Sequence, residues 1–271
     1  MVEGITDCQD PNGDKEWSLF YIENISEDFK KIIRENLISI CEGNDPIDDS
    51  YKNTVREFIR RCDSSTSSED RKKGMIGELL VHLILGEYYN YSSASALFNL
   101  EEKSFKKGFD LLMYNPKDNS LWITEVKSGE VVKEHKANRK MSILINRAKN
   151  DLKHRLNNSE DKNELWMNAY NHAKLAVNSP NERAAVLKLI KNNRSKVYKE
   201  KANSLKDDVL LAGVLFYTLS DRTDPDSIKE SQSNINVNSD NNDSQLFNHA
   251  KLVTIQENTY EEVLDFLRRE M

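Results

Sequence analysis

Residues 109–127 read FDLLMYNPKDNSLWITEVK, and this stretch decides the fold that we expect for the chain. Two apolar runs, at 109–114 and 121–127, have the composition of β-strands. Between them, Pro-Lys-Asp-Asn at 116–119 is a turn signal, because proline fixes its own backbone and Asn and Asp favour turns. The pattern predicts two antiparallel strands joined by a tight turn.

The register of this predicted hairpin brings two acidic residues together. A four-residue turn pairs Asn115 with Ser120 and, continuing outward, Asp110 with Glu125. Directly opposed residues have Cβ atoms about 5 Å apart, where two carboxylates repel each other unless a cation lies between them. An odd loop length would instead put the acids on opposite faces of the sheet. The four-residue turn therefore predicts a divalent cation site.

A lysine accompanies the two acids. Glu125 and Lys127 are two positions apart, so a strand presents both on one face, about 6.6 Å apart along its axis. Burying this charged pair within an apolar run is costly without compensation, which a metal ion beside the carboxylate would supply. In a metal site that carries out hydrolysis, we expect Lys127 to orient the water molecule that attacks the substrate or to help deprotonate it.

A third carboxylate, Glu78, lies in a predicted helix at 71–89, directly after Gly77 and within an apolar stripe. Three carboxylates suit a hard cation such as Mg²⁺ or Mn²⁺. His82 follows four residues later on the same helix face, and a partly buried histidine is the favoured interpretation over a ligand.

These motifs resemble the core of the PD-(D/E)XK nuclease superfamily: the helix Glu78, Asp110 in Lys-Gly-Phe-Asp, and Glu-Val-Lys at 125–127. Phe109 stands where the usual proline precedes the aspartate. The resemblance covers residues 71–128. It implies an α/β fold with a restriction-endonuclease-like core, a mixed central sheet flanked by helices, and hydrolysis of DNA by one or two Mg²⁺ or Mn²⁺ ions bound to Glu78, Asp110, Glu125 and the Val126 carbonyl.

A narrower resemblance begins with Lys-Gly-Met-Ile-Gly-Glu-Leu-Leu at 73–80 and continues through the same two motifs. This pattern is similar to that of the nuclease subunit of Hachiman anti-phage defence systems. The similarity implies a hetero-complex with a superfamily 2 helicase, which restrains the nuclease until altered DNA triggers degradation.

The net charge of −6 hides two basic segments. Residues 1–50 hold thirteen acidic and four basic side chains, whereas 133–155 hold eight basic and two acidic and 183–206 hold eight basic and one acidic. Lys-rich helices are usually solvated, but their position after the predicted site favours DNA contact. The best candidates for phosphate contacts are Arg139, Lys140, Arg147 and Lys149.

The remaining sequence suggests an acidic, helical N-terminal segment at 1–65 and a nuclease-like domain at 66–271. Within that domain we expect further strands at 96–100, 209–219 and 251–256, a closing helix at 260–269, a basic helical insertion at 133–206 with its helix (140–198) broken near 178–180, and a mobile Asn/Ser-rich loop at 221–248.

The location expected from the sequence is cytoplasmic. The longest apolar stretch, at 209–217, is far shorter than the roughly 20 residues of a membrane-spanning helix, and the N-terminus lacks the pattern of a signal peptide. Three cysteines, Cys8, Cys41 and Cys62, are too few and too widely spaced for a disulfide framework, so we expect reduced thiols.

Two other functions stay open. In a non-catalytic nucleic-acid-sensing or partner-binding subunit, the carboxylates and Lys127 would form a structural polar network, and an isolated Glu-x-Lys is usually a solvated pair. A restriction-type endonuclease would be recognised by a fixed cleavage site. The sequence does not distinguish a DNA substrate from RNA, or endonuclease from exonuclease action.

Overall fold

A computed structural model of the chain describes residues 2–9, 16–43, 50–64, 68–98, 108–131, 136–177, 179–200, 202–237 and 245–271. The strands are β1 (Ile5–Gln9), β2 (Trp17–Ile22), β3 (Ser92–Ser93), β4 (Leu111–Asn115), β5 (Ser120–Glu130), β6 (Asp208–Phe216) and β7 (His249–Glu257). The α-helices are α1 (Glu27–Glu42), α2 (Tyr51–Cys62), α3 (Glu69–Tyr89), α4 (Ala137–Asn157), α5 (Ser159–Ala176), α6 (Pro180–Lys199), α7 (Pro225–Ile235) and α8 (Glu261–Glu270). A short 3₁₀ helix, η1, spans Ser204–Lys206.

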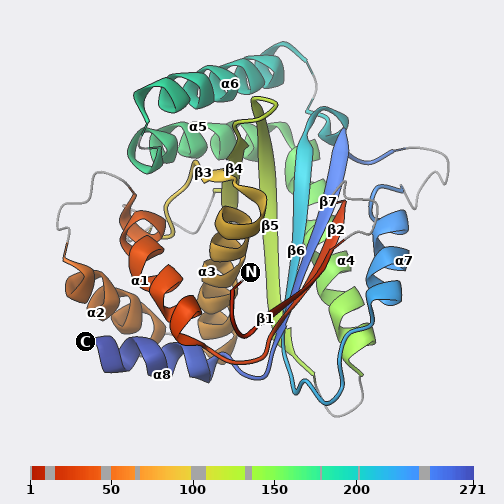
Figure 1. Cartoon of the computed structure of the whole chain (residues 1–271). Coiled ribbons are helices and arrows are strands. Elements are labelled where there is room, and N and C mark those ends of the chain that lie inside the picture. The colour runs from red at the N-terminus through yellow and green to blue at the C-terminus, as the bar shows by residue number, and fades with distance from the viewer. Residues whose placement is uncertain are drawn as a thin grey trace.

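The strands form one mixed sheet in the order β1-β2-β7-β6-β5-β4-β3. The four central strands, β2, β7, β6 and β5, are parallel to one another, while β1, β4 and β3 pair with their neighbours in antiparallel fashion. Helices cover both faces of this sheet, with α1, α2, α3 and α8 on one face and α4 and α7 on the other (Figure 1). The α/β class and the mixed central sheet flanked by helices are confirmed.

The central strand β6 separates two hydrophobic cores. Alternate side chains such as Leu210 and Ala212 pack with α3 and its neighbours, whereas Leu211 and Leu215 pack with α4. This alternation explains the near-continuous apolar run in the sequence, because a strand covered on both faces has no solvent side. The predicted central strand is confirmed, as are the strand at 251–256 and the closing helix.

The first 65 residues contain two strands that the sequence analysis missed. We expected helices there, and α1 and α2 are present, but β1 and β2 join the main sheet, with β2 parallel to β7. All six residues of β2 are buried. The apolar run of β2 is short and lies within an acidic segment, so it gave no clear strand signal. It forms a strand because it pairs with β7.

Three other sequence predictions differ from the structure. The helical region expected over 140–198 breaks near 178–180 as predicted, between α5 and α6, but it also breaks after α4, because the Asn158 side chain accepts hydrogen bonds from the amides of Glu160 and Asp161 and caps α5. Residues 225–235, expected in a loop, form α7, which buries Ile228 and Ile235. No strand forms over 96–98; the edge strand is β3, and residues 99–100 lie outside the described part.

Candidate active site

The β4–β5 hairpin has the predicted register. Asn115 pairs with Ser120, and the last pair of the ladder is Leu111 with Thr124. Asp110 and Glu125 are the next two residues outward from the turn. The carboxylate of Asp110 continues the connection, since its Oδ2 accepts a hydrogen bond of 2.9 Å from the Val126 amide. The structure therefore brings Asp110 beside Glu125.

Glu125 and Lys127 lie on the face of β5 that α4 covers. Gly129, two positions further along the same face, lies against the Leu144 and Lys140 side chains of α4. The Glu125 side chain is only 3% exposed, and its Oε1 accepts from Lys127 Nζ at 2.8 Å. Glu125 is thus buried, Lys127 is partly exposed, and the two side chains form a close ion pair.

Two residues of α4 complete this cluster, and the sequence analysis missed both. Arg155 donates one hydrogen bond to Glu125 Oε2 and another, of 3.0 Å, to the carbonyl of Gly108. Asp151 pairs with Lys127 Nζ at 2.9 Å. We call the set Asp110, Glu125, Lys127, Asp151 and Arg155 the hairpin cluster.

The helix α4 presents Asp151 and Arg155 to the sheet because they border its apolar stripe. Ala148, Leu152 and Leu156 are buried against the sheet at helical spacing. Asp151 and Arg155 are four residues apart, so they lie one turn from each other along the edge of that stripe. This spacing was the only available sequence signal, and opposite charges at such spacing are common on solvated helices.

The structure does not bring Glu78 to this cluster. Its helix, α3, packs on the other face of β5, where a Cβ at Gly77 would lie 1.8 Å from Ser128 Oγ. Glu78 itself is buried. Within the described ranges no group of three or more His, Cys, Asp or Glu side chains could hold a metal ion. Asp110 and Glu125 supply carboxylate oxygens suited to a hard cation, but both Glu125 oxygens are already paired with Lys127 and Arg155.

The predicted phosphate contacts divide into exposed and buried groups. Arg139 and Arg147 are exposed on α4. Lys149 is buried, and its Nζ donates to the carbonyls of Asn234 and Val237 at 3.1 and 3.2 Å, where it caps the end of α7. This contradicts an exposed phosphate contact, because the ammonium is committed to helix capping.

Lys140 lies at the opposite end of α4 from Arg155, beside Gly129. Burial lowers the pKa of Lys140, and the neighbouring Arg147 lowers it further. The side chain is half-buried, so only part of it is available to a phosphate.

A second basic surface lies on α6. Lys188, Lys191 and Lys199 are exposed and share one helix face by their spacing. Tyr198 is 67% exposed, and its hydroxyl accepts hydrogen bonds from Asn163 at 2.9 Å and Arg194 at 3.2 Å. We call these four residues the α6 surface. The charge count pointed to this segment, but exposure of the tyrosine followed only from the tertiary structure.

The α6 surface neighbours the candidate site through α5. Phe109, which precedes Asp110, makes an edge-to-face contact with Trp166 of α5, with ring centroids 5.1 Å apart. Asn163, the hydrogen-bond partner of Tyr198, is three residues before Trp166. Three residues, a rise of about 4.5 Å, thus separate the two contacts along α5.

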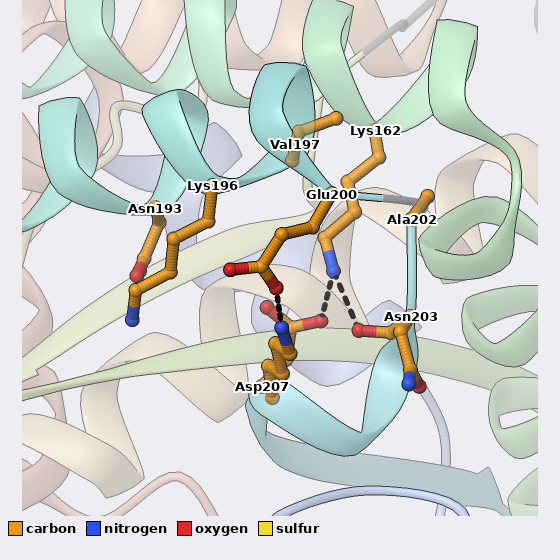
Figure 2. Close-up of a pocket in the computed structure, with 9 residues that line it drawn as sticks. Lys162, Asn193, Lys196, Val197, Glu200, Ala202, Asn203 and Asp207 are labelled. Atoms are coloured by element: carbon orange, nitrogen blue, oxygen red, sulfur yellow. Dashed lines mark hydrogen bonds and ion pairs between the residues drawn. The ribbon is translucent and has the colours of Figure 1, made fainter.

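A small cavity of about 20 Å³ lies between α5, α6 and η1. It surrounds the ion pair of Lys162 with Asp207 (2.5 Å), while Lys196 Nζ points away from that pair (Figure 2). Burial raises the pKa of Asp207 against the opposing effect of Lys162. The cavity accommodates about one water molecule, so we assign the ion pair a structural role.

The buried-histidine interpretation of His82 is confirmed. Its ring is 3% exposed, and Nε2 is 2.6 Å from Ser93 Oγ of β3. Burial lowers its pKa to about 4, so the ring is neutral at pH 7. The three cysteines are free thiols, as expected.

No helix among the described residues has the length and apolar character needed to cross a membrane. In a comparison with protein families, the model of the HamA family matches residues 2–267, nearly the whole chain. No curated protein matches the sequence.

Proposed function

Because the chain belongs to the HamA family, and is thus a component of a Hachiman anti-phage system that acts in a partner complex, we propose that it is the metal-dependent DNA nuclease of that system. Its catalytic centre is the hairpin cluster, in a PD-(D/E)XK arrangement. The partner we propose is a helicase subunit, which delivers or restrains the substrate.

One observation carries this proposal: Asp110 and Glu125 come together on one face of a hairpin, with Lys127 beside them. The Val126 amide holds Asp110 at 2.9 Å, and Lys127 Nζ lies 2.8 Å from Glu125. Two adjacent carboxylates can hold a metal ion, and a lysine beside them can position the water for metal-assisted phosphodiester hydrolysis.

Asp110 and Glu125 would hold Mg²⁺ or Mn²⁺, with the Val126 carbonyl as a further proposed ligand, whereas Glu78 lies on the other face of β5 and is not part of this site. When bound, the ion would lower the pKa of a water molecule and stabilise the charge that develops on the phosphate. Lys127 would position that water for in-line attack. Asp151 orients the Lys127 ammonium through their 2.9 Å contact.

Exposed cationic side chains could bind the phosphates of the DNA backbone. Arg139 and Arg147 of α4 and the α6 surface are available to phosphates. Contacts of this kind give affinity that depends on salt and little on base sequence.

The experiment is plasmid degradation by the chain, alone and with the proposed helicase partner, in Mg²⁺, Mn²⁺ or EDTA. Glu125→Gln and Lys127→Met should abolish cleavage, whereas Glu130→Gln, which changes an exposed carboxylate at the end of the same strand, should not. Protection against phage in cells provides a second readout. Full cleavage by Glu125→Gln would reject the site.

One observation favours the non-catalytic alternative. Both oxygens of Glu125 pair with cationic side chains of the chain itself, as in a structural network. Under this alternative, phage protection and partner binding survive Glu125→Gln, and wild type cleaves nothing in any metal, with the helicase present or absent.

A further inference from the structure

The position of Arg155 raises a question about the proposed nuclease that the motif residues do not answer. Its guanidinium contacts Glu125 Oε2, the carboxylate oxygen that Lys127 leaves available. A guanidinium and a divalent cation repel each other and would compete for that oxygen. Arg155 must therefore move from Glu125 before Oε2 can bind an ion.

We propose that Arg155 alternates between Glu125 and a phosphate of the nucleic-acid backbone, so that substrate binding frees Glu125 for the metal ion. This inference rests on the proposed function and names how its site is regulated. Arginine suits such an exchange, because its planar fork binds carboxylates and phosphates with the same two-pronged geometry.

The surroundings of Arg155 favour the exchange. Its side chain is 23% exposed, whereas that of Glu125 is 3% exposed. The guanidinium thus lies at the boundary between the buried carboxylate and solvent, from which a phosphate would approach. Its other contact, to the Gly108 carbonyl, is with a neutral acceptor, which binds a cation less strongly than a phosphate does.

The charges of the hairpin cluster indicate whether the metal ion and the phosphate help or oppose each other's binding. The hairpin cluster contains three carboxylates and two cationic side chains, a formal charge of −1. A divalent ion alone would reverse that charge to +1, and a phosphodiester would then neutralise it. Metal ion and phosphate should therefore bind cooperatively, with Arg155 as the group that changes partner.

The test measures Mn²⁺ affinity of the full chain by electron paramagnetic resonance, without and with a phosphorothioate single-stranded DNA that resists cleavage. Without DNA, Arg155→Gln should bind Mn²⁺ about tenfold more tightly than wild type, because the competing cation is gone. With DNA, wild type should gain about tenfold in Mn²⁺ affinity, whereas Arg155→Gln should gain little.

Two controls separate this effect from charge and from misfolding. Lys153→Gln removes one positive charge from the same helix and should leave both Mn²⁺ affinities unchanged. Arg155→Lys retains the charge but lacks the planar guanidinium. Without DNA it should bind Mn²⁺ as weakly as wild type, and adding DNA should not raise its Mn²⁺ affinity. Thermal melting identifies any variant that does not fold. If Arg155→Gln does not fold, the comparison of Arg155→Lys with wild type tests the proposal.

The outcomes distinguish the two levels of the proposal. Mn²⁺ binding that requires Glu125 but does not respond to Arg155 or to DNA would overturn the exchange and leave the nuclease intact. No Mn²⁺ binding by wild type or by Arg155→Gln, with or without DNA, would overturn both.

Discussion

The carboxylate of Asp110 accepts a hydrogen bond of 2.9 Å from the backbone amide of Val126, and this contact extends the β4–β5 hairpin by one position beyond its last paired residues. It makes Asp110 both a candidate metal ligand and a structural clamp, since the same side chain holds the strand that carries Glu125.

The two roles of Asp110 can be separated by substitution. Asp110→Ala should lower the free energy of unfolding by about 1–2 kcal/mol, because the Val126 amide loses its partner. Asp110→Asn keeps an acceptor oxygen and should cost less than half as much. Both should reduce metal-dependent cleavage by about 100-fold or more. Urea denaturation and plasmid cleavage measure the two effects; full cleavage by Asp110→Asn would remove it from the site.

The contact of α3 with β5 should be intolerant of a single methyl group. A Cβ at Gly77 would lie 1.8 Å from Ser128 Oγ and 3.0 Å from Ser128 Cβ, so Gly77→Ala should destabilise the protein by about 1–3 kcal/mol. Ser128→Gly should rescue it in the double variant. Gly74→Ala is the matched control, because nothing lies within 4 Å of its Cβ. It should stabilise the helix by up to about 1 kcal/mol.

His82 should make stability fall in acid. Burial lowers its pKa from 6.5 to about 4, so its contribution is fully present above about pH 6.5 and is lost as pH falls toward 4. That shift corresponds to about 3 kcal/mol at most. His82→Gln should flatten the pH dependence of urea unfolding in this window, whereas exposed His154→Gln should not. An unchanged profile in His82→Gln would assign acid sensitivity to other groups.

Glu257 at the end of β7 should act in the opposite direction. It is buried, neither carboxylate oxygen has a hydrogen-bond partner in the described residues, and burial raises its pKa well above the usual value. Its contribution is therefore present below about pH 4.5 and lost as pH rises. Glu257→Gln should raise Tm at pH 8, by about 2–4 °C for each kcal/mol gained, and should have no effect at pH 4. Glu87→Gln, on an exposed side chain, is the control.

The α6 surface should contribute to binding of single strands. Tyr198→Ser should weaken binding of a single-stranded oligonucleotide by about 1–3 kcal/mol if a base stacks on the ring. Lys188→Gln with Lys191→Gln should reduce the dependence of affinity on salt concentration by roughly two phosphate contacts. Fluorescence anisotropy over a salt series measures both. If the variants with these substitutions all bind the oligonucleotide as tightly as wild type, the nucleic acid does not bind to the α6 surface.

The sequence by itself determined the local geometry around Asp110 and Glu125. The turn at 116–119 has four residues and strands have a period of two, so the register and the shared face of the acids follow without reference to the rest of the chain. The near-continuous apolar run at 209–219 identified β6 for a similar reason, since a strand buried on both faces is apolar at almost every position.

Only the tertiary structure decided what surrounds those acids. Arg155 is thirty positions from Glu125 in the sequence and Asp151 is 24 positions from Lys127, and they meet because α4 packs on one face of β5 while α3, with Glu78, packs on the other. β2 likewise becomes part of the sheet through its pairing with β7. Contacts between distant segments depend on which helix covers which face, and hydrophobic periodicity specifies that a face is buried without specifying its partner.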